Sequence, residues 1–310
     1  MNKYASICLL FLFLTMQSCI KDDLSHCGLK EQSFIWFKSI NPKYNYAEIA
    51  QQVNLYLYDE QLQFAGELVY TQEELKQSQA KIYIPAEKKG AYTIIALVNL
   101  SDKYEIFDTE RLVTWKGSLH RGTGYEDISY KLPDIYHSMK KISFHADQKQ
   151  QEDTLYLVKN TNHIRLIVEC SSQGKLDSIQ PYIYGSNTMF SYENRLLGDR
   201  MVTYHPHTTT KQPGISEYSL TTMLLRTGGD ASLYFKALNP DGSYTDRKLF
   251  NITERLANVK NNNDGKVYDT DQKLAYEDEF EFKVVLDNSS QIMHLIINDW
   301  YVIKDYVEIK

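Results

Sequence analysis

The sequence predicts an all-β protein, and three features of its pattern support this prediction. Short segments that alternate apolar and polar residues with a period of two recur along the chain, as in 53–64. Helical periodicity is confined to short stretches, and strands do not alternate with helices in a βαβ rhythm. Many short strands joined by loops are typical of antiparallel β-sandwiches.

The expected strands follow one another through the chain. In segment 53–64, the side chains of Val53, Leu55 and Leu57 point to one face of the strand, while those of the residues between them point to the other. Segment 91–100 is more continuously apolar, which is typical of a strand buried on both faces. The other expected strands lie at 34–37, 81–85, 141–145, 153–160, 163–170, 181–185, 232–250, 279–287 and 293–303.

Two local signals refine this pattern. Segment 232–250 is predicted to be a β-hairpin, because it contains the turn sequence Asn-Pro-Asp-Gly at 239–242. Proline presets φ in such a turn, and glycine accepts the positive φ at its end. The best candidate for a helix is 71–80, where Thr71 and Glu74 have the spacing of a capping box.

The first residues have the layout of a bacterial lipoprotein signal peptide. Lys3 supplies a positive charge, and the apolar run 7–14 is much shorter than the about 20 residues of a membrane-spanning helix. Ser18 and Cys19 follow this run and resemble a lipobox, which implies cleavage after residue 18 and acylation of Cys19. The alternative is an ordinary secretory signal with an unrelated cysteine.

Three charged residues follow the cysteine. Lys21, Asp22 and Asp23 resemble the export signal that directs Bacteroidetes lipoproteins to the outer face of the outer membrane, and a solvated linker is the alternative. Acyl chains on Cys19 would exceed the two signals that stable anchoring requires. We therefore expect a surface-exposed, lipid-anchored outer-membrane protein with no cofactor beyond the covalent lipid on Cys19.

Composition limits the kinds of partner. The net charge is −6 and the sequence has no basic stripe, so nucleic acid is not an expected partner. Hydrophobic residues make up 43% of the chain, which is typical of a globular protein. The 24 tyrosines favour strands and amphipathic surfaces.

Four segments are expected along the chain. Residues 1–18 are the lipoprotein signal peptide, 19–27 a lipidated linker, 28–148 an N-terminal β-sandwich and 149–310 a C-terminal β-sandwich. The mature chain is long enough for two cores of about 100–150 residues each. We place the boundary in the polar stretch 145–153, because strongly apolar strands flank it on both sides.

Two cysteines remain after processing and acylation. In an exported protein Cys27 and Cys170 could form one disulfide. The alternative is that Cys27 stays a free thiol beside the tether. Their spacing does not decide between the two, because disulfide formation depends on three-dimensional geometry.

The sequence contains no catalytic constellation that stands out. We find no P-loop, dinucleotide fingerprint, HExxH motif or GxSxG elbow. His205 and His207 would share a strand face, but Pro206 interrupts the strand and a metal site needs three or four ligands. Glu279 and Glu281 alternate with phenylalanines, as on the solvent face of a strand. We therefore expect no metal and no enzymatic activity.

Several segments, in their order along the chain, resemble one family. They are Cys19 and Cys27 before the strand 34–37, the hairpin at 53–67, the buried strand 91–100, the passage from 134–144 to 155–169, and the strand pair 297–309 around Trp300. Together they resemble the FimB-type fimbrial anchor lipoproteins of the Bacteroidales over nearly the whole mature chain. The sequence departs from the family at Asn298 and Asp299, where a glycine is expected.

This resemblance implies both a fold and a role. The fold is two tandem transthyretin-like β-sandwich domains after the signal peptide. The role is non-enzymatic: a lipid-anchored subunit at the base of a fimbria, or pilus, that supports adhesion and binds fimbrial subunits through β-strand interactions. The alternative is a surface glycan-binding lipoprotein of a polysaccharide-uptake system, with the tyrosines supplying exposed aromatic rings. An extracellular hydrolase is a third alternative.

The C-terminal segment 294–310 also alternates apolar and polar residues. Such a segment is either the last strand of the second sandwich or a strand that is donated to a fimbrial subunit.

Overall fold

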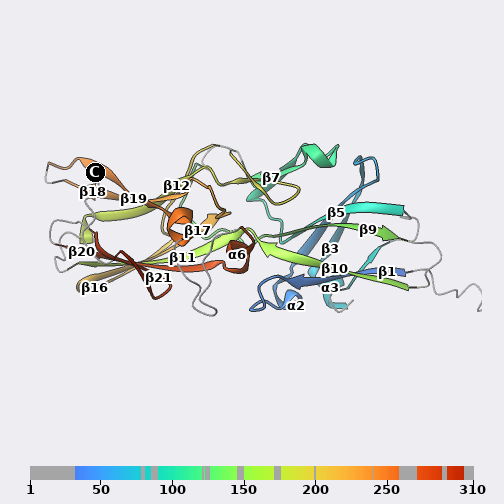
Figure 1. Ribbon diagram of the computed structural model, residues 1–310, viewed down its shortest axis with the longest axis horizontal. Helices are drawn as coiled ribbons and strands as arrows, with labels where there is room; N and C mark the ends of the chain where they lie inside the picture. Colours follow the sequence, from blue (N-terminus) through green and yellow to red (C-terminus); the bar gives the residue numbers. More distant parts are fainter. Residues whose placement is uncertain are drawn as a thin grey trace, which may run out of the picture.

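The computed structural model describes residues 32–77, 81–84, 90–120, 122, 126–144, 150–170, 176–198, 200–239, 241–257, 271–287 and 292–303. Strands predominate in this part of the chain and its helices are short, so the all-β prediction is confirmed. None of these helices is long and apolar enough to cross a membrane. The molecule is elongated, with an N-terminal half (32–159) at one end and a C-terminal half (161–303) at the other (Figure 1).

The N-terminal half is built on a sheet of seven described strands. These are β1 (Gln32–Ser39), β2 (Gln52–Tyr58), β3 (Phe64–Thr71), β4 (Lys81–Ile84), β5 (Gly90–Val98), β9 (Tyr136–Phe144) and β10 (Gln150–Lys159), in the order β3-β2-β5-β9-β10-β1-β4. The pairing of β9 with β10 is limited to Val158 with His137 and Lys159 with Tyr136. This short pairing divides the sheet into two layers. The outer layer is β4-β1-β10, and the middle layer is β9-β5-β2-β3.

The outer and middle layers face each other across a first hydrophobic core. Ile35 and Leu155 of the outer layer and Leu55 of the middle layer are fully buried in it. The alternation of side chains along each strand turns these apolar residues toward the facing layer, as in other β-sandwiches.

Strand β5 is buried on both faces, as its continuous apolar run predicts. Ile94 and Ala96 belong to the first core, whereas Ile95 and Leu97 point to the opposite side and belong to a second core. A four-stranded sheet covers that opposite side of the middle layer. Its strands are β6 (Tyr104–Phe107), β7 (Lys116–Leu119), β13 (Met189–Ser191) and β14 (Leu196–Leu197), in the order β14-β13-β7-β6.

The four-stranded sheet joins the two halves, since β6 and β7 come from one and β13 and β14 from the other. Trp115, the residue directly before β7, is 1% exposed. The Trp115 ring centroid lies 6.2 Å from that of Tyr56 and 6.0 Å from those of Phe190 and His137. Burial, with the nearby charge of Arg226, lowers the pKa of His137 to about 3, so its imidazole is neutral in this aromatic cluster.

Two further sheets form most of the C-terminal half, and the second of them also includes a short strand of the N-terminal half. The six-stranded sheet has the order β16-β17-β11-β20-β21-β22, from β11 (Thr161–Cys170), β16 (Thr208–Gln212), β17 (Ile215–Met223), β20 (Glu279–Leu286), β21 (Ile292–Ile297) and β22 (Trp300–Ile303). The five-stranded sheet has the order β19-β18-β12-β15-β8, from β8 (Asp127–Ile128), β12 (Ile179–Gly185), β15 (Val202–Tyr204), β18 (Ser232–Leu238) and β19 (Tyr244–Asn251). Residues such as Leu166 and Ile183 fill the second core between them.

The helices are short, and the local signals of the sequence are confirmed. They are α2 (Tyr46–Ile49), α3 (Gln72–Gln77), η1 (Leu112–Thr114), α5 (Ile252–Leu256) and α6 (Asp271–Tyr276). The Thr71 N–H donates to Glu74 Oε2 over 2.8 Å, and the Glu74 N–H donates to Thr71 Oγ1 over 3.5 Å, as in a capping box. In the β18–β19 hairpin Gly242 has a φ of 82° and donates to the Asn239 carbonyl over 3.0 Å.

The prediction of purely antiparallel sheets needs correction. β1 pairs with β10, β11 with β20 and β8 with β15 in parallel orientation. Each pair joins strands that lie far apart in the sequence, and the long intervening chain supplies the crossover that parallel pairing requires. Alternation along one strand carries no information about the direction of its neighbour.

The predicted boundary between residues 148 and 149 lies outside the described residues. The strand that follows it, β10, pairs with β1 and β9 of the N-terminal half. The chain passes to the C-terminal half at Asn160, between β10 and β11.

The departure from the family pattern forms a turn. Asn298 and Asp299 have φ angles of 47° and 67° and connect β21 to β22. Asn and Asp tolerate this left-handed conformation better than other non-glycine residues. The Asn298 Oδ1 also accepts the Glu281 N–H over 2.8 Å.

Candidate functional site

The predicted lipidation and export residues lie outside the described part of the chain. They are Cys19, Lys21, Asp22 and Asp23, and the same holds for Cys27. The first described residue, Gln32, pairs with Gln150 at the start of β10. Strands β1 and β10 both begin at the end of the N-terminal half that is remote from the C-terminal half (Figure 1).

Cys170 is the last residue of β11 and is buried. Its Sγ lies 3.6 Å from the carbonyl oxygen of Asp287, to which the thiol can donate. The pairing of Cys27 with Cys170 stays a prediction.

His205 and His207 have separate partners. The Nε2 atom of His205 lies 3.2 Å from Asp127 Oδ1, and the Nε2 atom of His207 lies 3.2 Å from Thr221 Oγ1. Among the described residues no group of three or more His, Cys, Asp or Glu side chains could hold a metal ion.

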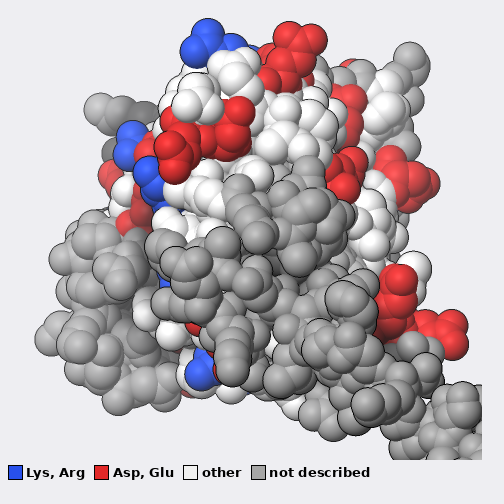
Figure 2. Space-filling view, turned by 90° about the vertical axis from the view of Figure 1, so that its right-hand side faces the viewer, with Lys and Arg blue, Asp and Glu red and all other residues white. Residues whose placement is uncertain are grey.

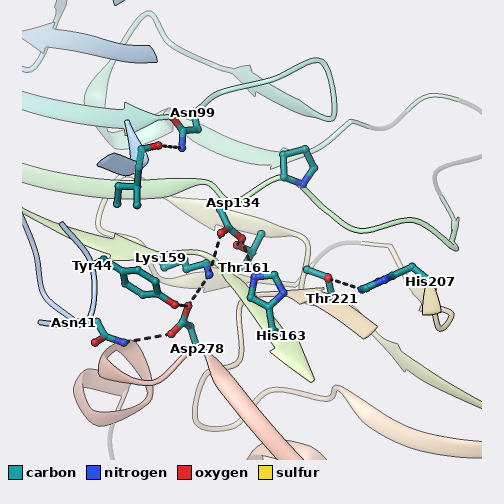
Figure 3. A network of polar contacts seen from close by, with 12 residues as sticks. Asn41, Tyr44, Asn99, Asp134, Lys159, Thr161, His163, His207, Thr221 and Asp278 are labelled. Carbon is teal, nitrogen blue, oxygen red and sulfur yellow. Dashed lines mark hydrogen bonds and ion pairs between the residues drawn. The ribbon is translucent and has the colours of Figure 1, made fainter. Parts of the chain in front are cut away.

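A network of polar contacts lies where the two halves meet (Figure 3). We call it the junction network; it consists of Asn41, Tyr44, Asp134, Lys159, Thr161, His163 and Asp278. These residues come from the segment after β1, the segment before β9, the passage from β10 to β11 and the segment before β20. Both halves therefore contribute to it.

Lys159 is the centre of the junction network. Its side chain is 4% exposed, and its Nζ lies 2.6 Å from Asp278 Oδ2 and 3.1 Å from Asp134 Oδ2. The same ammonium group lies 5.0 Å from the centroid of the Tyr44 ring. Two carboxylates and an aromatic face thus compensate for the water that the buried ammonium has lost.

Asp278 connects the C-terminal half to the segment after β1. Its Oδ2 accepts the Tyr44 hydroxyl over 2.5 Å, and its Oδ1 accepts the Asn41 amide over 3.3 Å. Burial and the hydrogen bond to Asp278 raise the pKa of Tyr44, which remains a neutral donor. The Asp278 carbonyl also accepts the His163 N–H over 2.6 Å.

Asp134 binds the other side of the network. Its Oδ1 accepts the Thr161 hydroxyl over 3.1 Å and lies 3.0 Å from His163 Nε2. Burial alone would raise the pKa of Asp134, but the hydrogen bond from His163 and the charge of Lys159 outweigh it and lower the pKa to about 2. Asp134 is therefore ionised at neutral pH.

This arrangement is suited to holding two parts of a protein in a fixed orientation. Lys159 and its carboxylate partners have opposite charges at short distance, and donors from several segments occupy the remaining carboxylate lone pairs. The sequence pattern does not predict the network, because Lys159 has the position of a polar residue at the end of strand 153–160. Its partners lie far away in the sequence, so only the fold brings them together.

Strand β16 forms an open edge of the six-stranded sheet. All five of its residues are exposed, and β17 is its pairing partner among the described strands. An exposed edge presents backbone donors and acceptors to which a strand of another chain can pair.

Comparison with known proteins identifies a matching family. The family described as fimbrillin-A associated anchor proteins Mfa1 and Mfa2 matches residues 39–306. No significant match was found among curated proteins.

Several solved structures share the fold at low sequence identity. A candidate polysaccharide-binding protein from Bacteroides thetaiotaomicron superposes with a TM-score of 0.75 at 18% identity, covering 89% of this chain and 98% of that one. A candidate adhesin from the same species has a TM-score of 0.70 at 19% identity, with coverages of 88% and 98%. The fimbrial anchor protein Mfa2 from Porphyromonas gingivalis has a TM-score of 0.69 at 18% identity, with coverages of 89% and 99%.

Proposed function

The chain belongs to the family of fimbrillin-A associated anchor proteins, and we propose that it is the lipid-anchored subunit that holds a fimbria on the outer membrane. The main support for this proposal is the family match, which extends over residues 39–306. In this role the protein binds fimbrial subunits, supports adhesion and performs no chemical reaction.

The attachment to the membrane is proposed to be the lipid on Cys19, with Lys21, Asp22 and Asp23 as the export signal. Figure 2 views the molecule from the end at which the described chain begins. On the described surface seen there, Asp and Glu side chains form the larger coloured patches. An acidic surface is repelled by anionic lipid headgroups, which favours attachment through a lipidated tether over attachment through surface charge.

The course of the strands supports a load-bearing role. β10 and β11 contain ten residues each and follow one another with Asn160 between them. At about 3.3 Å per residue they make a continuous element of roughly 65 Å through both halves. The C-terminal half would therefore stand away from the membrane.

The pairing of β1 with β10 resists a pull along this axis. The two strands are parallel and pair at eight positions, from Gln32 with Gln150 to Ser39 with Leu157. A force on the N-terminus pulls β1 away from the junction, while the fimbria pulls β10 toward it. The force therefore acts in shear on all the backbone hydrogen bonds between β1 and β10 together. They must break at the same time and not one after another.

We further propose that the two halves are transthyretin-like β-sandwich domains with their boundary near Asn160. The support is that two hydrophobic cores are present, the first between the layers of the N-terminal half and the second for the most part between the sheets of the C-terminal half. The proposed contact with the next subunit is strand addition at an open edge, for which the exposed strand β16 is the best candidate.

The experiment that tests the anchor function changes the lipidated cysteine. In Cys19→Ala cells the mature chain should leave the membrane fraction, and fimbriae should appear in the culture medium. Alanines at Lys21, Asp22 and Asp23 should keep the protein in the membrane but protect it from protease added to whole cells. Cys170→Ala, which removes a thiol at the end of β11 but keeps the proposed lipid acceptor, is the control. If Cys19→Ala cells retain both protein and fimbriae, the proposal is wrong.

A further inference from the structure

The outer face of the five-stranded sheet carries a group of tyrosines that the anchor role does not use. Tyr182 and Tyr184 lie on β12 and Tyr234 on β18, and they alternate with buried residues such as Ile183 and Leu233. The tyrosines therefore point away from the second core. We propose that this face binds a neutral saccharide.

The three rings form one aromatic surface. Tyr182 and Tyr234 are directly opposite each other on neighbouring strands, and their rings are stacked with centroids 5.1 Å apart. The Tyr184 ring meets that of Tyr234 at 86° with centroids 6.2 Å apart, and Tyr184 is 37% exposed. The imidazole of His205 continues the row, 6.2 Å from Tyr182.

A shallow groove of about 300 Å³ lies over these rings, and polar groups line it. Besides the aromatic residues, its lining consists of Asp127, Thr203, Lys236 and Asp246. Carboxylates accept hydrogen bonds from hydroxyl groups, and aromatic rings pack against the C–H faces of a sugar ring. Apolar walls with a few convergent polar groups are the usual composition of a small-molecule site.

The charge of the lining disfavours an anionic ligand. Asp127 and Asp246 lie in the same groove as Lys236, so two carboxylates stand against one ammonium group.

The strands under the groove disfavour an extended peptide as the ligand. β12 lies between β18 and β15, β15 between β12 and β8, and β18 between β19 and β12. Where these strands pair, at 179–184 of β12 with β18 and at 183–185 of β12 with β15, their backbone groups are engaged in the sheet and are not available for strand addition. Recognition must come from side chains, and those present match the hydroxyl groups and apolar faces of a saccharide.

The location also fits an exposed binding surface. The five-stranded sheet lies in the C-terminal half, which is the end of the molecule remote from the start of β1 (Figure 1). The inference does not rest on the anchor function, because it uses only the groups on this face.

Affinity electrophoresis of the full mature chain tests the inference. The gels contain soluble starch, yeast mannan, galactomannan or arabinoxylan as neutral polysaccharides, and polygalacturonate as a charged one. We expect at least one neutral polysaccharide to retard the protein more than polygalacturonate does. Tyr184→Ala should weaken that binding about five- to tenfold, as loss of an aromatic contact does. Asp246→Asn should weaken it by a similar factor.

The matched control is Tyr156→Ala on β10, a tyrosine that is 57% exposed in the other half. It should leave the retardation unchanged, and thermal unfolding should show that all three variants are folded. Absence of retardation by every neutral polysaccharide overturns the inference. Equal weakening of saccharide binding by Tyr184→Ala and Tyr156→Ala also overturns the inference. It is likewise overturned if the face binds a fimbrial subunit in place of a saccharide and Tyr184→Ala abolishes that binding.

Discussion

At the scale of single residues, the junction network concentrates charge in a buried place. Lys159 and Asp278 are both 4% exposed at their side chains, and each compensates in part for the water that the other has lost. A buried ion pair adds little net stability over an apolar contact, but removal of one partner is strongly destabilising. The network therefore specifies how the halves meet more than it adds to their stability.

Lys159→Ala tests this view of the ion pair. The change leaves Asp134 and Asp278 near each other without their common cation, so the free energy of unfolding should fall by about 3–5 kcal/mol. Urea denaturation measures it. The control Lys43→Ala removes an exposed lysine that lies 3.8 Å from Glu277 and Glu279, and it should change the stability by less than about 1 kcal/mol. Similar losses in both variants would contradict the assigned role of Lys159.

Asp134 gives the network a dependence on pH. Its pKa in the folded protein, about 2, lies below the ordinary value of 3.8, so its contribution to stability is present above pH 3.8 and disappears as the pH falls toward 2. Asp134→Asn should lower the free energy of unfolding by about 1–2 kcal/mol at neutral pH, allowing for partial exposure. The difference from the wild type should vanish near pH 2.

Denaturant titrations at several pH values between 7 and 2 measure this difference. Asp102→Asn, which removes an exposed carboxylate, is the control. Its free energy of unfolding should differ from that of the wild type by the same amount at every pH. If the free energies of unfolding of Asp134→Asn and the wild type differ by the same amount down to pH 2, the Asp134 carboxylate is not the cause of the pH dependence.

At the scale of elements, the four-stranded sheet is the main apolar connection between the halves. β7 of the N-terminal half pairs with β13 of the C-terminal half, and Gly117 stands opposite Phe190. The Phe190 ring lies directly over the glycine and packs against Trp115. A side chain at position 117 would occupy the space that the ring fills.

Gly117→Ala should therefore loosen this connection. An ideal Cβ at position 117 would lie 2.4 Å from Phe190 Cζ, and Phe190 is fully buried and cannot easily move away. The free energy of unfolding should fall by about 1–3 kcal/mol. Thermal or urea unfolding measures it. Gly198→Ala, where a Cβ meets open space, is the matched control and should change the stability by less than about 0.5 kcal/mol.

At the scale of the whole molecule, the two halves are tied together at several places. β8 of the N-terminal half belongs to the five-stranded sheet, and the four-stranded sheet contains strands of both halves. The junction network adds polar contacts between the halves, such as that of Lys159 with Asp278. A boundary near Asn160 would therefore not separate two bodies that move independently, and the second core contains residues from both sides of it, such as Ile95 and Leu166.

Limited proteolysis tests this description. We expect the first cut in the polar stretch 145–153, where β9 has ended. The two fragments should remain together in size-exclusion chromatography, because β10 pairs with β1 at eight positions and leads into β11. They should separate only in denaturant. Dissociation of the fragments under native conditions, or a first cut within 91–100, would contradict the arrangement.

The sequence by itself determined the all-β class, most strand positions, the buried strand at 91–100, the helix cap at Thr71 and the family resemblance. These features follow from local physical chemistry: side-chain alternation, turn residues and caps act over a few neighbours. The predicted lipid site at Cys19 and the possible disulfide between Cys27 and Cys170 are interpretations of the sequence alone.

Only the tertiary structure decided which strands pair in parallel, that β10 belongs to the N-terminal half, and that Lys159 meets Asp134 and Asp278. It also decided that Tyr182 and Tyr234 share one exposed face. The physical reason is that these contacts join segments far apart in the chain. Local pattern predicts which face of a strand is apolar, but not which distant strand will cover it.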